Sequence, residues 1–220
     1  MTMTNIELAR YNMIEQQIRP WDVMDDRVLD LLVQVPREAF VPDAYKALAF
    51  TDMPLPLGHG QCMMPPKLEA RILQALAPQP HETILEIGTG SGYFTALLAR
   101  SAAHVYSVDL YADLSEQAGR HLEEQNIHNV TLEVGDAAQG WSHHDRVDAI
   151  VITAALPVLP DPFRQDIKVG GRLLAIVGES PSMEVQLIRR TGERDWTTEN
   201  LFETDMPCLT NARQPERFVL

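Results

Sequence analysis

The sequence predicts an α/β fold in which a doubly wound, mainly parallel sheet follows an N-terminal helical extension. Two observations predict it. From residue 83 onward, short apolar runs alternate with amphipathic helical segments, as in sheets covered by helices on both faces. Before that point, residues 6–50 offer only helical candidates. We therefore expect one compact unit, with the helical extension and a loop over residues 1–80 and an α/β core over residues 81–220.

Three helices are expected in the extension. The first covers residues 6–19, where apolar residues recur at broadly helical spacing until Pro20 stops the helix. The second covers residues 25–35, with an aspartate able to cap its start and a clear apolar stripe. The third is short and covers residues 43–50.

A loop rich in proline and glycine joins the extension to the core. Residues 52–66 contain four prolines and two glycines, and this composition predicts a segment without regular structure. The segment is also too apolar for an ordinary solvated loop. It is interpreted either as an ordered loop folded over an active site or as a connector packed on the core. A helix is expected next, over residues 67–76.

The core is expected to alternate strands and helices. Strands are predicted over residues 84–87, 104–108, 130–134, 147–153 and 172–177, and helices over residues 93–100, 113–125 and 160–167. The run 147–153 is almost wholly apolar, as a strand covered on both faces should be. Residues 183–190 and 196–203 are expected to form two antiparallel strands, and the tail 217–220 could add a short one.

Composition narrows the classes of partner and location. The formal net charge of −13 and the lack of a basic cluster argue against a nucleic-acid substrate. No apolar run is long enough to span a membrane, and the first residues lack an export-signal pattern. The two cysteines, Cys62 and Cys208, fit a reducing cytoplasm without a disulfide framework. A cytoplasmic protein is expected, and no pattern indicates an oligomeric state.

A glycine-rich turn follows the first core strand. Gly88, Gly90 and Gly92 are spaced two apart, and a helical pattern begins at Tyr93. Such a turn lets backbone N–H groups approach a nucleotide-like ligand, because glycine has no Cβ. The NAD fingerprint needs glycine at the sixth position, which Tyr93 occupies here. The shorter pattern, preceded by Glu86, is typical of S-adenosylmethionine-dependent methyltransferases, although glycine could also serve the turn geometry alone.

Two carboxylates are predicted to lie near this turn. Asp109 ends the strand 104–108 and is placed to accept hydrogen bonds from ribose hydroxyls, while Asp136 follows the strand 130–134 and is placed to accept one from an adenine amino group. Each acid could instead be an ordinary turn or helix cap. Open α/β sheets bind ligands at the carboxyl ends of their strands, where the turn and both acids fall. Together they predict an adenosine site.

Other candidate sites are less favoured. The run His143, His144 and Asp145 is interpreted as solvated rather than metal-binding, and no metal is expected. A nucleophilic Cys62 beside His59 would need a lowered thiol pKa, which no sequence feature indicates. After the strand 147–153, the chain lacks the Asn-Pro-Pro-Tyr motif of methyltransferases that modify base amino groups.

The motifs outside the turn resemble the protein-L-isoaspartate O-methyltransferase family. The resemblance covers roughly residues 10 to 190 and rests on runs matching V-P-R-x-x-F-V-P, D-x-P-L-P-I-G-x-G-Q and V-G-D-G-x-x-G-W, and on two later motifs. These runs are residues 35–42, 52–61, 134–141, 148–155 and 170–173. The resemblance implies a Rossmann-like methyltransferase sheet and an enzyme that methylates isoaspartyl residues in damaged proteins or peptides, initiating their repair.

The resemblance also implies which residues form the site. The cofactor S-adenosyl-L-methionine is expected to contact Glu86, Gly88, Thr89, Gly90, Ser91, Gly92, Asp109, Leu110, Asp136, Ala137 and Thr153. The acceptor is expected to be bordered by His59, Gln61, Cys62 and Met64.

Three departures from the family pattern bear on the acceptor. Met64 occupies the position of the family serine thought to engage the substrate carboxylate, and a thioether cannot donate a hydrogen bond. Asp109 replaces the usual glutamate, and residues 206–209 only faintly echo the C-terminal F-V-P-L segment. Two alternatives therefore stay open: a related methyltransferase with another acceptor, and a non-catalytic module that binds S-adenosylmethionine.

Overall fold

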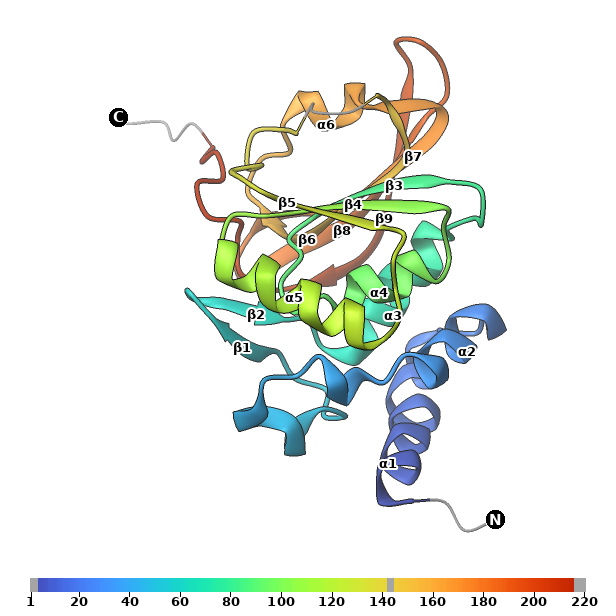
Figure 1. Ribbon diagram of the computed structural model, residues 1–220. Coiled ribbons are helices and arrows are strands. Elements are labelled where there is room, and N and C mark those ends of the chain that lie inside the picture. The colour runs from blue at the N-terminus through green and yellow to red at the C-terminus, as the bar shows by residue number, and fades with distance from the viewer. Residues whose placement is uncertain (1–3, 142–144, 216–220) are drawn as a thin grey trace.

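The computed structural model describes residues 4–141 and 145–215 and is built around one seven-stranded sheet (Figure 1). Its strand order is β5-β4-β3-β6-β7-β8-β9. The strands are β3 (Thr83–Ile87), β4 (His104–Asp109), β5 (Val130–Val134), β6 (Val147–Leu156), β7 (Ile167–Glu179), β8 (Ser182–Arg190) and β9 (Trp196–Thr204). Strands β3 to β7 pair in parallel, whereas β8 and β9 are antiparallel. The predicted mainly parallel sheet is confirmed.

Alternate residues of the central strands enter two separate apolar cores. Ile84 and Val151 face the core that also contains helices α3 (Pro66–Leu76) and α4 (Tyr93–Ala99), and α5 (Ala112–Glu124) contributes Leu122. Leu85 and Ile152 face the opposite core, which is covered by the short helix α6 (Asp161–Gln165). Because side chains alternate along a strand, a fully buried sheet requires apolar residues at nearly every position.

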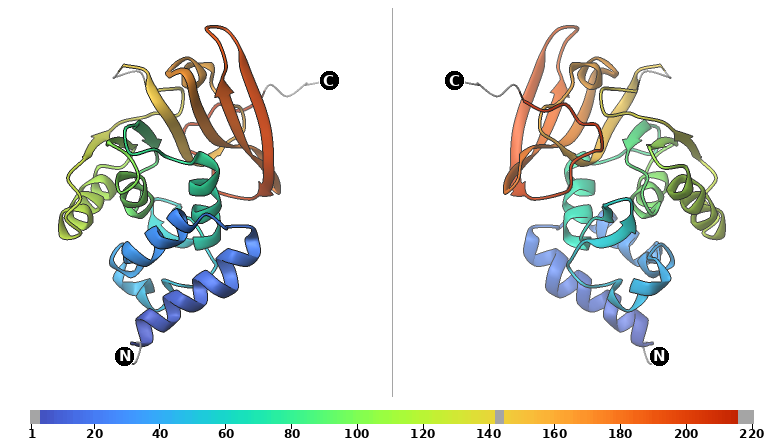
Figure 2. Two further views of the ribbon diagram at one scale, coloured as in Figure 1. Left: turned by 90° about the vertical axis from the view of Figure 1, so that its right-hand side faces the viewer. Right: turned by 90° about the vertical axis from the view of Figure 1, so that its left-hand side faces the viewer.

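The N-terminal extension packs beneath α3 and α4, as two further views show (Figure 2). Its elements are α1 (Asn5–Met13), a π-helical turn (Ile14–Ile18), a 3₁₀ turn (Arg19–Trp21), α2 (Asp26–Gln34) and 3₁₀ turns at Arg37–Ala39 and Asp43–Leu48. The prediction of one helix over residues 6–19 was therefore too simple, because helical winding changes twice before it ends. The third predicted helix is a 3₁₀ helix rather than an α-helix.

The loop over residues 52–66 was predicted to lack regular structure, and that prediction was wrong. Strands β1 (Leu55–Gly58) and β2 (Gln61–Met63) form an antiparallel hairpin. The hairpin turns at His59 and Gly60, both with positive φ. Proline is tolerated here because a two-stranded ribbon leaves each strand with an edge that needs no hydrogen bond.

Two boundaries in the C-terminal half also differ from prediction. The helix expected over residues 160–167 ends at Gln165, and β7 begins at Ile167 rather than at Arg172. Ile167 pairs with Val147 of β6, so sheet pairing takes over the residues that looked helical. The tail 217–220, His143 and His144 lie outside the described residues. No helix in the described part of the chain is long and apolar enough to cross a membrane.

Candidate active site

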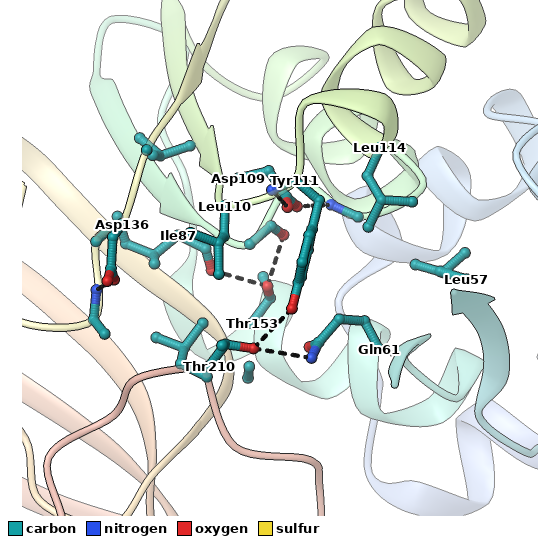
Figure 3. Close-up of a pocket in the computed structure, with 18 of the residues that line it drawn as sticks. Leu57, Gln61, Ile87, Asp109, Leu110, Tyr111, Leu114, Asp136, Thr153 and Thr210 are labelled. Carbon is teal, nitrogen blue, oxygen red and sulfur yellow. Dashed lines mark hydrogen bonds between the residues drawn. The ribbon is translucent and has the colours of Figure 1, made fainter. Parts of the chain in front are cut away.

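A pocket opens at the carboxyl ends of β3, β4, β5 and β6, where open α/β sheets bind ligands. The residues lining it come from the glycine turn, the strand ends, the hairpin and the C-terminal segment (Figure 3). They include Leu57, Gln61, Cys62, Gly88, Gly90, Asp109, Leu110, Tyr111, Asp136, Ala137, Thr153, Leu209 and Thr210. We call this the outer pocket.

The glycine turn is held in place by its neighbours. The Gly88 N–H donates to the Val108 carbonyl at 2.8 Å, and the Thr153 hydroxyl donates to the Gly88 carbonyl at 2.8 Å. Gly88 has a φ of +100°, and a Cβ placed on it would lie 2.4 Å from the Thr153 Oγ1. Glycine is required here for both conformation and space.

Asp109 is buried at the end of β4 and accepts two backbone hydrogen bonds. Its Oδ2 accepts from the Gly90 N–H at 2.8 Å, and its Oδ1 accepts from the Tyr111 N–H at 2.9 Å. An ionised carboxylate has about four acceptor positions. Asp109 therefore fixes the glycine turn and still has lone pairs for two hydroxyl donors.

Asp136 lies across the pocket and connects the end of β5 to the C-terminal segment. Its Oδ1 accepts from the Ala138 N–H at 3.0 Å, which makes a local turn cap. Its Oδ2 accepts from the Asn211 amide at 2.8 Å. The capping role that the sequence left open is thus real, and the same carboxylate also anchors a segment 75 residues away.

The C-terminal segment and the hairpin meet over the outer pocket. The Thr210 hydroxyl lies 3.1 Å from the Tyr111 hydroxyl and accepts from the Gln61 amide at 3.5 Å (Figure 3). The His59 ring stacks on the Tyr111 ring with centroids 4.1 Å apart, and its Nε2 lies 2.9 Å from an oxygen of Asp113. The hydrogen bond from His59 lowers the pKa of Asp113. The hairpin, the start of α5 and the C-terminal segment therefore contact one another over the outer pocket. We call the contacts among Gln61, Tyr111 and Thr210 the roof of this pocket.

Cys62 does not form a reactive pair with His59. Burial raises the pKa of the Cys62 thiol, which opposes thiolate formation. His59 is turned toward Tyr111 and Asp113 instead. Among the described residues, no group of three or more His, Cys, Asp or Glu side chains could hold a metal ion.

Glu86 lies behind the glycine turn rather than on the wall of the outer pocket. Its Oε2 accepts from the Thr95 hydroxyl at 2.5 Å and from the Ser107 hydroxyl at 2.6 Å. The Ser107 hydroxyl also lies 2.6 Å from the Thr89 hydroxyl, so the network extends into the turn. Burial raises the pKa of Glu86 to about 8, against hydrogen bonds from Ser107 and Thr95 that lower it.

The raised pKa of Glu86 predicts a pH-dependent stability. In the folded state Glu86 keeps a proton that it releases in the unfolded chain. The contribution of Glu86 to stability is therefore fully present below pH 4.5 and is lost as the pH rises through about 8. As the pH rises across this window, we expect Glu86→Gln to become more stable relative to wild type. The difference in unfolding free energy should change by up to about 1.4 kcal/mol per pH unit. Urea unfolding at pH 5, 6.5 and 8 measures it, and parallel pH profiles would contradict the assignment.

Met64 is buried in a second, smaller cavity beside the glycine turn, which we call the inner cavity. The two cavities share the lining residues Leu57, Cys62, Gly88, Gly90 and Thr153. The inner cavity alone is lined by Met63, Met64, Glu69, Thr89, Ser91 and Phe94. Met64 is 4% exposed, and its carbonyl accepts from the Arg37 guanidinium at 2.8 Å.

The structure brings most predicted site residues to these two cavities. Nine line the outer pocket: Gln61, Cys62, Gly88, Gly90, Asp109, Leu110, Asp136, Ala137 and Thr153. Met64, Thr89 and Ser91 line the inner cavity. Gly92 lines neither cavity and is the N-cap residue of α4. Tyr111, Leu209 and Thr210 were missed. The faint motif at residues 206–209 was the one available signal for the C-terminal contribution.

This arrangement fits an adenosine-containing cofactor. Gly88 and Gly90 line the pocket without side chains, and two carboxylates offer acceptors for hydroxyl and amino groups. A parallel sheet with this turn after its first strand and these acids after the next two defines the class of S-adenosylmethionine-dependent methyltransferases.

Comparison with known proteins identifies the family within that class. The model of the Protein-L-isoaspartate(D-aspartate) O-methyltransferase (PCMT) family matches residues 9–213. Protein-L-isoaspartate O-methyltransferase 2 of Pelobacter propionicus is 40% identical over 201 residues, covering 91% of this chain and 89% of the relative. The protein-L-isoaspartate O-methyltransferase of Gloeobacter violaceus is 41% identical over 180 residues, covering 81% and 88%. The chain belongs to this family.

The fold agrees with solved structures. A Plasmodium falciparum protein-L-isoaspartate O-methyltransferase in complex with S-adenosyl-L-homocysteine superposes with a TM-score of 0.78 at 18% identity, covering 94% of this chain and 99% of that chain. The predictions of the family, of an enzyme and of an S-adenosylmethionine-dependent methyltransferase are therefore confirmed.

Proposed function

We propose that this protein methylates the α-carboxylate of isoaspartyl residues in damaged proteins or peptides, using S-adenosyl-L-methionine, and so acts in protein repair. The observation that carries the proposal is family membership over residues 9–213 together with a pocket lined by the family's cofactor motifs. The two free thiols, Cys62 and Cys208, support a cytoplasmic location, where thiols stay reduced.

The cofactor would extend from the outer pocket toward the inner cavity. Asp136 would receive the adenine end, with Leu110 and Ala137 against the ring, and Asp109 would accept from the ribose hydroxyls. The glycine turn, with Thr89 and Ser91, would hold the amino-acid end, and Thr153 would stay bound to the turn. Glu86 and Gly92 would act on the cofactor through the conformation of the turn. His59, Gln61 and Cys62 would border the acceptor from the hairpin.

The reaction needs orientation more than acid–base chemistry. A carboxylate acceptor has a reference pKa near 4 and is already ionised at neutral pH. When bound, S-adenosylmethionine would supply a sulfonium methyl group, whose carbon such an oxygen can attack directly while the carbon–sulfur bond breaks and S-adenosylhomocysteine leaves as a neutral thioether. The protein then has to hold the acceptor oxygen in line and exclude water. The roof formed by Thr210, Tyr111 and Gln61 serves that exclusion.

Met64 is expected to weaken this reaction without preventing cofactor binding. A hydrogen bond to a charged group contributes about 1.5–3 kcal/mol, or roughly 10- to 150-fold. The thioether of Met64 cannot supply it, although it lines the inner cavity beside the turn.

Replacing Met64 with serine is expected to raise kcat/KM for an isoaspartyl peptide by about 10-fold or more, because the hydroxyl can donate to the acceptor carboxylate. The measurement is labelled methyl transfer to an isoaspartyl peptide, with the normal aspartyl peptide as background. Met64→Ala is the matched control, since it opens a similar cavity without adding a donor.

The outcomes separate the candidate functions. A gain with serine but not alanine supports a carboxyl methyltransferase whose acceptor site has lost one donor. If neither the wild type nor Met64→Ser transfers a methyl group to any isoaspartyl peptide while both bind S-adenosylmethionine, the proposed function is wrong. A different acceptor or a non-catalytic role would then take its place.

A further inference from the structure

The C-terminal segment reaches Asp136 with one side chain, that of Asn211. The Asn211 amide donates to Asp136 Oδ2 at 2.8 Å. Asp136 is exposed just after β5, and its Oδ1 accepts from the Ala138 N–H at 3.0 Å. Each oxygen of an ionised carboxylate has about two acceptor positions. The two bonds therefore fix the plane of the carboxylate and leave an acceptor position open on each oxygen.

Asn211 is itself held in place by a tight turn. The Ala212 N–H donates to the Leu209 carbonyl at 3.1 Å, and Asn211, the third residue of this turn, has a φ of +65°. The Leu209 N–H donates to the Ala155 carbonyl at 2.9 Å, which ties the turn to the end of β6. A positive φ at the third position of a turn favours glycine or asparagine. Of these two residues, only asparagine has a side-chain donor for Asp136.

We propose that Asn211 is a positioning residue for the cofactor: it holds Asp136 in the orientation that accepts a hydrogen bond from the adenine amino group, and so contributes to the selectivity of the outer pocket for adenine. The inference rests on the proposed function, in which Asp136 receives the adenine end. An exposed carboxylate without this bond would lose rotational freedom when the cofactor binds, and that loss lowers affinity. A base without an amino group gains nothing from the orientation of Asp136.

The test compares two ligands by calorimetry: S-adenosyl-L-homocysteine, and its analogue in which hydrogen replaces the 6-amino group of adenine. Asn211→Gly removes the amide and keeps a residue that adopts positive φ without strain. We expect the variant to bind S-adenosyl-L-homocysteine about three- to tenfold more weakly than wild type does, which is the size of one net hydrogen bond. Its affinity for the analogue should be unchanged. The readout is the ratio of the two affinities, because general damage to the pocket would weaken both ligands alike.

Asn126→Gly is the matched control. Asn126 is also an exposed asparagine with a positive φ, of 53°, and it follows α5 at the end opposite to Tyr111. The affinity ratio of this variant should equal that of wild type. Asp136→Ala is the reference for a complete loss, because it removes the acceptor itself. It should bind S-adenosyl-L-homocysteine and the analogue equally well.

The outcomes separate this inference from the proposed function. If Asn211→Gly keeps the wild-type ratio while Asp136→Ala loses it, the role of Asn211 is overturned and the proposed place of the adenine stands. Tighter binding of S-adenosyl-L-homocysteine by Asn211→Gly would also overturn it, because Asn211 would then compete with adenine for Asp136. If Asp136→Ala keeps the ratio, the adenine does not bind Asp136, and the inference fails with that part of the proposed function. The methyl-transfer assay tests the acceptor separately.

Discussion

Asp109→Ala is expected to weaken the binding of S-adenosylmethionine by about 100-fold or more. In the proposed binding mode the variant loses the acceptor for two ribose hydroxyls, and each such bond to a charged group contributes about 1.5–3 kcal/mol. It also frees the Gly90 and Tyr111 N–H groups that Asp109 now binds at 2.8 and 2.9 Å, so the turn itself loosens. Calorimetric titration with S-adenosylmethionine measures the effect directly.

The control is Glu116→Ala, which removes a carboxylate from the neighbouring helix α5. Glu116 pairs with Arg120 on the exposed surface, and such pairs contribute little. Its affinity for S-adenosylmethionine should stay within about twofold of wild type. A loss below about fivefold in Asp109→Ala would show that this carboxylate does not hold the ribose.

Arg37→Ala is expected to lower the free energy of unfolding by about 3–5 kcal/mol. The change leaves the Glu69 carboxylate buried without its cation and removes the donors that the Ala49 and Met64 carbonyls accept. Burial raises the pKa of Glu69 to about 8 even beside Arg37, and removing the Arg37 charge raises it further, so the orphaned acid keeps its proton. Urea unfolding followed by circular dichroism measures the loss.

Lys46→Ala is the corresponding control. It breaks the exposed Asp43–Lys46 pair in the same extension and should leave the unfolding midpoint unchanged. If Arg37→Ala unfolded at the same urea concentration as Lys46→Ala, the buried pair would contribute no more to stability than a surface pair does, which would contradict the prediction.

Short sequence patterns predicted the strands and helices of the α/β core well, because the preferences of neighbouring residues decide these elements. The strand, turn and helix around Gly88 follow from an apolar run and from glycines that adopt positive φ. Prediction was poorer where tertiary pairing overrode composition. Residues 55–63 form a hairpin although Pro56 lies within its first strand, and Ile167 joins β7 because Val147 offers it a partner.

By itself the sequence determined the family, the mainly parallel sheet, and the placing of the glycine turn, Asp109 and Asp136 at one edge, because strand ends of a parallel sheet meet there. Only the tertiary structure decided which distant segments cover the site and which charged side chains lie beside it. Thr210 reaches Tyr111 from 99 residues away, and Arg37 reaches Glu69 from 32. Such contacts depend on how separate elements pack, and no local pattern encodes them.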